Sequence, residues 1–500
     1  MRSSRARVLT LVAGVALGRL ALASAAWGFG FRAVSDDDFA RVTIAQRFVA
    51  APHLDPTGTS WLPLPFWLLG GAMKLVGTSL AAARGVSMAE AALATAWLAF
   101  VALRAGLSRG RVLAACLFAS AMPWGMQLTL ATVPEAPAAA LAAAAAISLA
   151  SASSPLRVLG ALSLLASVLS RYDAWPLAFA FAALSARDAV RARGRDRALL
   201  ALAGALALAG PLAWSLWEWA KYGDPLRYFG LVRSYRRALG QGPSLRERVL
   251  GYPRGMFDEL REVLFLGAGA LVTWIATRRR LVARAELAWV RPLSLAALQL
   301  LVLIAGDVRD GAPTHHPERA LLGPATVVVF ASIDAIGARL SRLRRRTAAS
   351  LVASLALAMA IWVAQQLRHS LRFYADVPRT REIAAGEELR AKVPRCERVL
   401  VDTRDLSGGV RDYGYYAVMA AFGRPRSVEI DRDQDPRKPA RASSFEAPSL
   451  LRRRAEVAGA RWLLAWGDRH REAALAAGAS LVAEERAGQQ GVRWALLRLP

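Results

Sequence analysis

Residues 8–28, VLTLVAGVALGRLALASAAWG, are almost entirely apolar, and residues 35–41, SDDDFAR, follow them closely. A helix of about 20 apolar residues crosses the ~30 Å hydrocarbon core of a bilayer, so residues 8–28 are long enough to span it. The aspartates then lie outside the core, because a charged triplet is expensive to bury in lipid. This stretch predicts a membrane protein that begins with a transmembrane helix and an acidic loop.

A cleaved signal peptide is the alternative for this first segment. Basic residues precede it, and Ala23, Ser24 and Ala25 are small residues of the kind found at cleavage sites. The apolar run continues through Trp27, and many further apolar runs follow, so we favour a retained helix. Arg19 lies within the run, and a snorkelling or bundle-facing charge is the simplest interpretation of it.

The composition agrees with a membrane protein. Of the 500 residues 55% are hydrophobic, and 65 Lys and Arg exceed 38 Asp and Glu, which gives a formal net charge of +27. Such basicity can indicate nucleic-acid binding, but in a polytopic membrane protein it more often reflects arginine-rich cytoplasmic loops. We therefore expect no nucleic-acid partner. The two cysteines, Cys116 and Cys396, cannot form a disulfide framework or a CxxC metal site.

Hydropathy predicts about eleven transmembrane helices before residue 370. The apolar runs lie near 8–28, 83–103, 111–130, 136–151, 156–170, 175–186, 198–219, 261–277, 292–306, 320–338 and 348–367. Most arginine-rich loops fall on one side of this map, which the positive-inside rule makes cytoplasmic. The N-terminus is therefore predicted to be cytoplasmic. The basic loop 221–258 is an exception and is predicted to be external.

The composition becomes polar beyond residue 370, where short apolar strings alternate with helix-like stretches. The strings lie at 399–402, 427–430, 462–466 and 492–497, and the helix-like stretches lie around 412–422, 449–458 and 469–477. This alternation predicts a small α/β domain at 370–500, after a transmembrane domain at 1–369 that includes a first external loop at 29–82. An odd number of spans from a cytoplasmic N-terminus makes the second domain extracytoplasmic.

The acidic triplet Asp36, Asp37 and Asp38 has two interpretations. A helix start would relieve the repulsion between the carboxylates, so the triplet could simply begin the amphipathic stretch that follows. The functional alternative is a general base at the membrane surface, with one carboxylate raised toward neutral pKa by its neighbours. Arg41 is placed for an ordinary ion pair with Asp37, one helical turn away.

Further polar residues lie at the predicted external ends of other helices. Prolines and aromatic residues around Trp61 suit an interfacial segment or a lipid-lined groove. The remaining candidates are Glu135, Arg171, Tyr172, Asp173, His315, His316, Glu318 and Arg319. Glu135 could cap its helix, and Arg171 could pair with Asp173 across a tight turn. Adjacent imidazoles and an arginine at a helix N-terminus would donate to a phosphate, whereas two histidines without further ligands are a weak metal signal.

In layout, residues 1–370 resemble the GT-C superfamily of membrane glycosyltransferases, which use polyprenyl-phosphate sugars. Asp37-Asp38 is similar to the acidic pair of the first external loop in that superfamily, and residues 61–67, WLPLPFW, are similar to its proline-aromatic stretch. Residues 315–322, HHPERALL, look like the His-x-Glu-Arg-Phe-Leu run of mannosyltransferases, with Ala320 where an aromatic is usual. The protein O-mannosyltransferase and aminoarabinose-transferase branch is nearest in overall shape.

The resemblance implies an inverting transfer from a polyprenyl-phosphate sugar to a hydroxyl of a glycan, lipid or protein, in a bacterial inner or plasma membrane. We expect Asp37 or Asp38 to be the base, with Asp36 the weakest candidate. Arg171, His315, His316 and Arg319 would then bind the donor phosphate, and the supporting residues would be Arg41, Trp61, Glu135, Tyr172, Asp173 and Glu318. The sequence indicates no cofactor and no dedicated metal site, although the carboxylates could recruit a divalent ion.

Two other classes of protein remain open. A transporter or flippase for an anionic lipid-linked solute would use the same charges along a pathway, but it would show mid-span ionisable residues and repeated halves. Apart from Arg19 the sequence shows neither. A noncatalytic scaffold that presents the C-terminal domain to a partner is the other class, and it would not need the side chains of Asp37 or His316.

Overall fold

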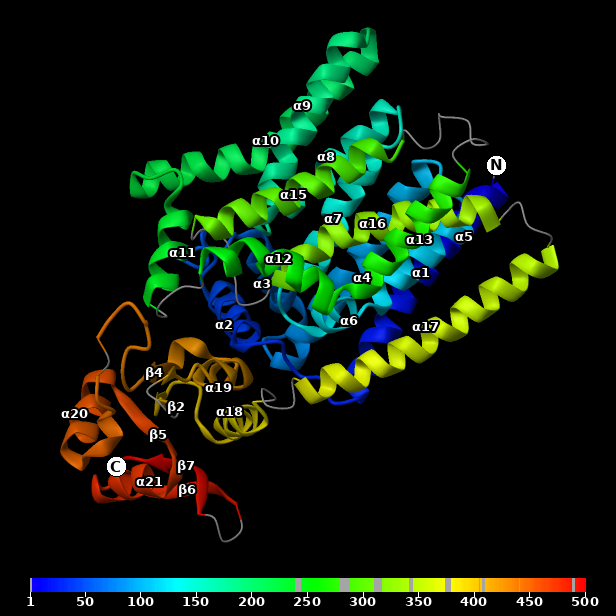
Figure 1. The fold of residues 1–500 in the computed structure, drawn as a ribbon. Coiled ribbons are helices and arrows are strands. Elements are labelled where there is room, and N and C mark those ends of the chain that lie inside the picture. Colours follow the sequence, from blue (N-terminus) through cyan, green and yellow to red (C-terminus); the bar gives the residue numbers. More distant parts are fainter. Residues whose placement is uncertain are drawn as a thin grey trace.

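The computed structural model describes residues 2–238, 244–277, 288–309, 317–340, 345–373, 379–403, 405–406, 410–439, 441–487 and 491–500. The helices up to Phe373 form one bundle, and the C-terminal elements lie beyond the end of the bundle at which α2 is found (Figure 1). The helices of the bundle are α1 (Arg2–Gly28), α2 (Asp36–Ala50), α3 (Leu64–Val76), α4 (Leu80–Arg104), α5 (Arg109–Ala121), α6 (Pro123–Leu130), α7 (Glu135–Ser148), α8 (Ser154–Val168), η1 (Tyr172–Ala174), α9 (Trp175–Arg191), α10 (Gly194–Tyr222), α11 (Arg227–Ala238), α12 (Leu245–Glu259), α13 (Arg261–Thr277), α15 (Val290–Val308), α16 (Pro317–Leu340) and α17 (Arg345–Phe373).

Each of the eleven apolar runs overlaps a helix, but fewer helices are long and apolar enough to cross a bilayer. Within the described residues five pass by length and composition: Ala6–Gly28, Leu80–Arg104, Gly194–Tyr222, Val290–Val308 and Pro317–Arg339. A sixth is possible if α5 and α6 form one span, which bends by 72° where Pro123 starts a new helix. The count of about eleven spans therefore stays a prediction.

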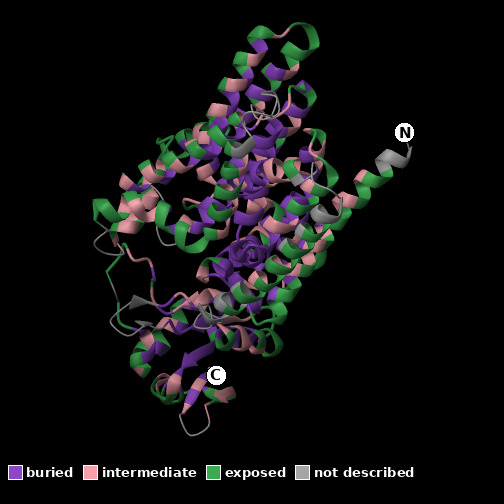
Figure 2. Cartoon of the chain, turned by 45° about the vertical axis from the view of Figure 1, so that its right-hand side comes forward, coloured by how far each residue is buried: buried purple, intermediate pink, exposed green. Residues whose placement is uncertain are grey.

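The bundle is packed around the alanine-rich helix α7. Nearly every residue of α7 is buried, and it lies against α4, α8 and α16. A Cβ atom on Gly160 of α8 would lie 2.7 Å from the Cβ of Ser148, so the two helices approach closely. Small residues permit such close packing, which in a membrane replaces the hydrophobic driving force between helices. The buried residues accordingly gather in the middle of the bundle (Figure 2).

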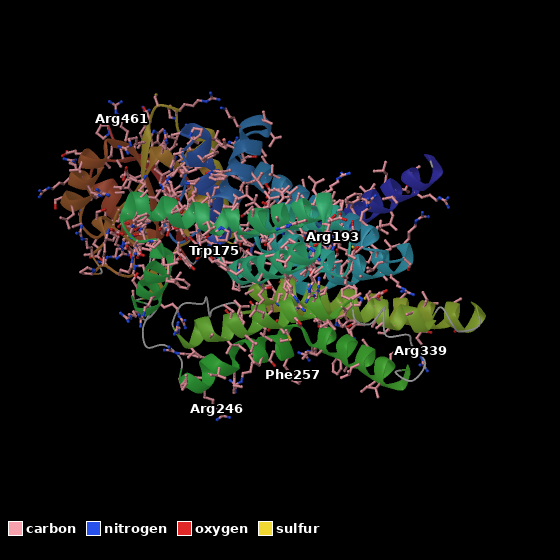
Figure 3. The ribbon with its side chains drawn as sticks, turned by 90° about the horizontal axis from the view of Figure 1, so that it is seen from above. Trp175, Arg193, Arg246, Phe257, Arg339 and Arg461 are labelled. Atoms are coloured by element: carbon pink, nitrogen blue, oxygen red, sulfur yellow. The ribbon has the colours of Figure 1, made fainter. Side chains whose placement is uncertain are left out.

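The outer faces of the bundle keep large apolar side chains exposed. Leu17 on α1 and Leu93 on α4 are 66% and 68% exposed, and Phe265 on α13 is 72% exposed. Apolar residues on the outside of long apolar helices suit contact with lipid tails rather than with water. Seen from above, Trp175 at the start of α9 lies nearer the end that carries Arg461 than Arg193 and Arg339 do (Figure 3).

The C-terminal residues form a mixed sheet with helices on both faces. The five-stranded sheet has the order β4-β1-β5-β7-β6, in which β4, β1 and β5 are parallel while β7 and β6 are antiparallel to their neighbours. The elements are α18 (Thr380–Lys392), β1 (Arg398–Val401), β2 (Asp405–Leu406), β3 (Val410–Arg411), α19 (Tyr415–Phe422), η2 (Pro425–Ser427), β4 (Val428–Ile430), η3 (Ser444–Glu446), α20 (Pro448–Ala458), β5 (Ala460–Trp466), α21 (Gly467–Ala476), β6 (Ser480–Arg486) and β7 (Val492–Arg498).

Alternate side chains of each strand pack against helices on opposite faces of the sheet. In β1, Val399 and Val401 pack with α18 and α19, whereas Leu400 packs with α20 and α21. Successive strand residues point to opposite faces, so buried strands with both faces covered are apolar throughout. Strands and helices thus lie close to the predicted segments. The strand β6 was not predicted, since its sequence SLVAEER is polar over much of its length.

The sheet region is held against the bundle mainly through α19 and α2. Ala417 and Ala420 of α19 are buried in a cluster with Phe39 and Val42 of α2. The amide nitrogen of Gln46 on α2 also donates to the carbonyl oxygen of Ala420 at 2.8 Å. The helix that carries the acidic triplet is therefore a shared element of the bundle and the sheet region.

Gly386 of α18 tests the packing of α18 on α19. A Cβ atom there would lie 2.5 Å from the backbone oxygen of Val418, so Gly386→Ala must push the helices apart. We expect the free energy of unfolding to fall by about 1–3 kcal/mol, measured as a lower Tm of the purified protein. Gly85→Ala on α4 is the matched control, because its Cβ would meet no atom within 4 Å. An equal loss of Tm in both variants would contradict the prediction.

Candidate active site

The acidic triplet begins α2, with Ser35 in the N-cap position. Asp38 completes the cap, because its Oδ2 atom accepts hydrogen bonds from the backbone nitrogens of Val34 at 3.2 Å and Ser35 at 3.1 Å. Its Oδ1 atom accepts from the backbone nitrogen of Thr132 at 3.2 Å, and the Thr132 hydroxyl donates to the Asp38 carbonyl at 2.6 Å. Asp38 thus joins the helix start to the segment before α7.

Asp36 points toward the sheet region. Both of its carboxylate oxygens accept from Arg379, at 2.9 Å from Nε and 2.7 Å from Nη2. Arg379 also lies 2.6 Å from Asp412 and 3.5 Å from Glu382. These partners give Asp36 a role in docking the sheet region, and they occupy the oxygens that a catalytic base would need.

Asp37 is the exposed member of the triplet. Its side chain is 51% exposed, and its Oδ2 atom lies 3.8 Å from Nη1 of Arg319, which is 7% exposed. Arg319 sits in the first turn of α16, and its Nη2 atom donates to the Ser35 hydroxyl at 3.1 Å. A carboxylate open to solvent is therefore placed beside a buried guanidinium.

A second ion-pair group lies at the start of α7. Nη1 of Arg171 lies 2.5 Å from Glu135, and its Nε atom donates to both oxygens of Asp173 at 3.0 Å. The predicted turn pair of Arg171 with Asp173 is therefore present, and it extends to Glu135. Two carboxylates fix the orientation of this guanidinium.

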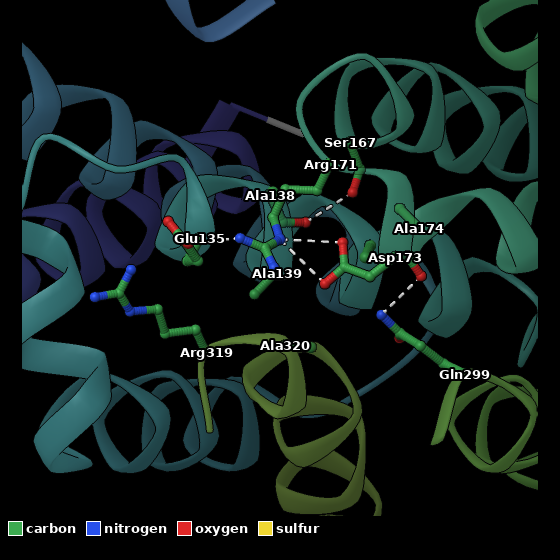
Figure 4. Close-up of a pocket in the computed structure, with 12 residues that line it drawn as sticks. Glu135, Ala138, Ala139, Ser167, Arg171, Asp173, Ala174, Gln299, Arg319 and Ala320 are labelled. Atoms are coloured by element: carbon green, nitrogen blue, oxygen red, sulfur yellow. Dashed lines mark hydrogen bonds and ion pairs between the residues drawn. The ribbon is translucent and has the colours of Figure 1, made fainter. Parts of the chain in front are cut away.

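The two groups meet at a small cavity between α7 and α16 (Figure 4). Its polar lining includes Glu135, Arg171, Asp173, Gln299 and Arg319, and alanines form most of the rest. The Nε atom of Arg319 and the Oε2 atom of Glu135 are buried without hydrogen-bond partners within the described part of the chain. Unsatisfied buried polar atoms at a cavity are candidates for ligand contacts.

Arg41 adds a third buried guanidinium to this region. Its guanidinium lies 4.3 Å from the centre of the Trp61 ring, and its Nε atom has no hydrogen-bond partner in the described ranges. The expected Arg41–Asp37 pair is wrong, since the described residues contain no such contact within 4.0 Å and Asp37 faces Arg319 instead. The Arg41 guanidinium is held instead by its stacking on Trp61.

The protein environment shifts the acidities of the triplet in different ways. Burial raises the pKa of Asp38 to about 6, although the charge of Arg319 and the backbone donors at Ser35 and Val34 act in the opposite direction. Burial also raises the pKa of Asp36, against the stabilising contacts of Arg379. The sequence predicted like-charge neighbours as the cause of a raised pKa, but desolvation is the larger effect.

The remaining residues that the sequence predicted for the site are Tyr172, Glu318, His315 and His316. Tyr172 contacts another aromatic group, with its ring 3.7 Å from that of Tyr228 and its hydroxyl accepting from Trp214 at 3.2 Å. Glu318 is buried at the start of α16. His315 and His316 lie outside the described residues. Among the described residues no group of three or more His, Cys, Asp or Glu side chains is arranged to hold a metal ion.

Three residues that contact the site could not be identified from the sequence. Arg379 is one arginine among many, and only its contacts with Asp36 and Asp412 reveal its role. Thr132 and Gln299 are ordinary polar residues whose importance depends on what they contact, Asp38 in one case and the Asp173 carbonyl in the other. No spacing rule connects residues so far apart in the chain.

The comparisons with known proteins bear on the fold. No protein-family model matches the chain, and no curated protein matches it. Among solved structures, ArnT from Cupriavidus metallidurans bound to undecaprenyl phosphate superposes with a TM-score of 0.58 at 14% identity, covering 98% of this chain and 97% of that one. The same protein in the apo state gives 0.56 at 13%, covering 99% and 98%.

The oligosaccharyltransferase of Archaeoglobus fulgidus, in complex with zinc and sulfate, gives a TM-score of 0.55 at 16% identity, covering 91% of this chain and 67% of that one. The chain therefore shares the overall fold of these proteins over nearly its whole length. Together with its long apolar helices, this fold makes the chain an integral membrane protein.

Arg379 provides a test of the docking between the sheet region and α2. Arg379→Gln removes the guanidinium that contacts the partly exposed carboxylate of Asp36 and the buried carboxylate of Asp412, which is expected to cost about 3 kcal/mol locally. Hydrogen exchange of the backbone amides in residues 36–41 and 412–416 should then become faster. Arg437→Gln is the control, because its pair with Asp435 is on the surface and contributes little. Unchanged exchange in Arg379→Gln would refute the docking role.

Proposed function

We propose that this protein is a membrane glycosyltransferase that moves a sugar from a polyprenyl-phosphate donor to an acceptor hydroxyl on the extracytoplasmic face. The observation that carries the proposal is the exposed Asp37 carboxylate beside Arg319, which also lines the cavity with Arg171. Such a transfer needs a base for the acceptor and cations for the departing phosphate. The likeness to ArnT bound to undecaprenyl phosphate supports a lipid-linked donor.

Asp37 is the proposed general base. A base must reach the proton that it removes, and geometry takes precedence over pKa in this choice. Asp37 is half exposed, whereas Asp38 is 4% exposed and its oxygens already accept from backbone nitrogens. The raised pKa of Asp38 would suit a base, but no acceptor can approach its oxygens without breaking the start of α2. Asp36 is held by Arg379.

The arginines are the proposed phosphate ligands. Arg171 is oriented by Glu135 and Asp173, so it can present its charge to the cavity without reorganisation, and such preorganised charge stabilises a developing anion. Arg319 keeps an unsatisfied Nε atom and has Asp37 as its ion-pair partner, at 3.8 Å. Arg41 adds positive charge to the same region. His315 and His316 remain predicted donors to the phosphate.

The proposed reaction is a single displacement. The acceptor oxygen forms a bond to the anomeric carbon while the bond from that carbon to the phosphate oxygen breaks. Asp37 takes the acceptor proton, and polyprenyl phosphate leaves with the bonding electron pair beside the arginines. Attack opposite the leaving group inverts the configuration at the sugar carbon. This assignment is supported by the exposure of Asp37 and by Arg319, which lies beside Asp37 and also lines the cavity.

The topology that accompanies this function is also a proposal. Residues 1–369 would form the catalytic bundle, and residues 370–500 would form an extracytoplasmic domain that supports α2 from outside. The position of Arg193 and Arg339 farther from the sheet end than Trp175 supports a cytoplasmic side at the opposite end of the bundle (Figure 3). A glycan, a lipid and a protein all remain possible acceptors.

Asp37→Asn is expected to reduce sugar transfer by about 10²–10⁴-fold, the range typical for loss of a general base, without a change in Tm. Asp38→Asn should instead lower Tm. The measurement is transfer from radiolabelled polyprenyl-phosphate sugars by the protein in reconstituted vesicles. Asp433→Asn, in a surface ion pair with Lys438, is the control. Full activity in Asp37→Asn would remove the base assignment, and inactivity of the wild type with every donor would remove the proposed function.

Arg319→Gln is expected to weaken donor binding and transfer by about 10–100-fold, since a charge-assisted hydrogen bond is worth about 1.5–3 kcal/mol. Arg319→Lys should recover part of the loss, because it keeps the charge but not the fork of donors. Initial rates against donor concentration separate KM from kcat. Arg461→Gln, at an exposed position near the start of β5, is the matched control. Equal kinetics in Arg319→Gln and wild type would exclude Arg319 from the phosphate site.

A further inference from the structure

Arg19 is a buried cation near the middle of α1. It lies about 14 Å from the Gly28 end of the helix at a rise of about 1.5 Å per residue, and it is 5% exposed. Its Nη1 atom donates to the Ser120 hydroxyl at 3.2 Å, whereas its Nε atom is buried without a hydrogen-bond partner in the described ranges. No carboxylate lies within 4.0 Å of it among the described residues.

A buried arginine in this position is stabilised by a nearby negative charge. Removal of a guanidinium from water is costly, and a neutral hydroxyl such as that of Ser120 compensates only a small part of the cost. Arginine also keeps its proton under ordinary conditions, so the side chain does not escape the cost by losing its charge. Ionisable residues at membrane depth usually pair with each other or face a functional cavity.

Arg19 does line a cavity, and the lining is suited to an anion. The cavity is small and lies between α1, α4, α5, α7 and α16, and its polar lining comprises Arg19, Thr95, Cys116 and Thr326. The two threonine hydroxyls donate to the carbonyls of Ala91 and Leu322 within their own helices. The lining thus offers guanidinium and thiol donors and no carboxylate, which excludes a cation as the preferred occupant.

We propose that this cavity binds a small inorganic anion, of the size and charge of chloride, against the guanidinium of Arg19. The apolar lining by alanines and Leu98 keeps the ion in a medium of low dielectric constant, where its attraction to the guanidinium is strong. A cavity of this size has no room for a large headgroup without displacement of α7, nearly all of whose residues are buried.

The site is separate from the candidate active site but next to it. Both cavities are lined by Ala139 of α7, and each is also lined by neighbouring residues of α16. This inference does not rest on the proposed function, because its test measures binding and stability and not sugar transfer.

The test is thermal unfolding of the purified full chain in detergent while sodium chloride or sodium bromide replaces sodium gluconate at constant ionic strength. Ligand binding to the folded state raises Tm in a saturable manner. We expect this rise in the wild type and in Arg104→Met, which removes an exposed arginine of α4. Arg19→Met should lose the halide-dependent rise. A wild type without halide dependence, or an Arg19→Met variant that keeps it, would overturn the proposal.

A second measurement decides the case in which Arg19→Met does not fold. Crystals of the wild type soaked in bromide should give an anomalous peak within hydrogen-bond distance of the Arg19 guanidinium. A peak in the cavity supports the site independently of any variant. Bromide sites on the surface alone, with no peak beside Arg19, would refute it.

Discussion

The start of α2 carries three successive carboxylates, and the rest of the site depends on how the fold separates them. Like charges on adjacent residues repel, so each side chain needs a different environment. Asp36 is bound by Arg379 of the sheet region, Asp38 is buried under backbone donors, and Asp37 is left exposed beside Arg319. One short acidic run thereby supplies a docking contact, a helix cap and an open carboxylate.

The site also depends on the close packing of α7 against its neighbouring helices. Its alanines let α4, α8 and α16 approach, which brings Glu135 at its first turn near Arg171 and Arg319. The same small side chains leave space that larger residues would fill, and both cavities border Ala139. A helix of weak hydropathy can occupy the centre of the bundle because it contacts protein on nearly every side and has little need of lipid-facing apolar surface.

The sheet region has a structural connection to the site that a separate appended domain would lack. Gln46 and the apolar face of α2 contact α19, and Arg379 binds the first aspartate of the triplet. A change in the sheet region would therefore reach Asp37 through its neighbours in the chain. The mixed sheet itself contributes no residue to the cavity lining.

The sequence by itself determined the helical bundle, most of the C-terminal strands and helices, and the set of polar segments at the helix ends that are predicted to be external. These features follow from segment hydropathy and local periodicity, which act over a few residues. It also pointed to Asp37, Glu135, Arg171 and Arg319, which the fold brings together at one end of α7. It did not distinguish the three aspartates, and it predicted an Arg41–Asp37 pair that the structure replaces with stacking on Trp61.

Only the tertiary structure decided which aspartate is exposed, which arginine docks the sheet region and where Arg19 finds a cavity. Asp36 and Arg379 are separated by 343 positions in the chain, and Arg19 and Ser120 by 101. Such contacts depend on the directions in which packed helices turn their side chains. A local pattern fixes the kind of environment that a residue prefers, whereas its partner is selected by whichever distant element the packing places next to it.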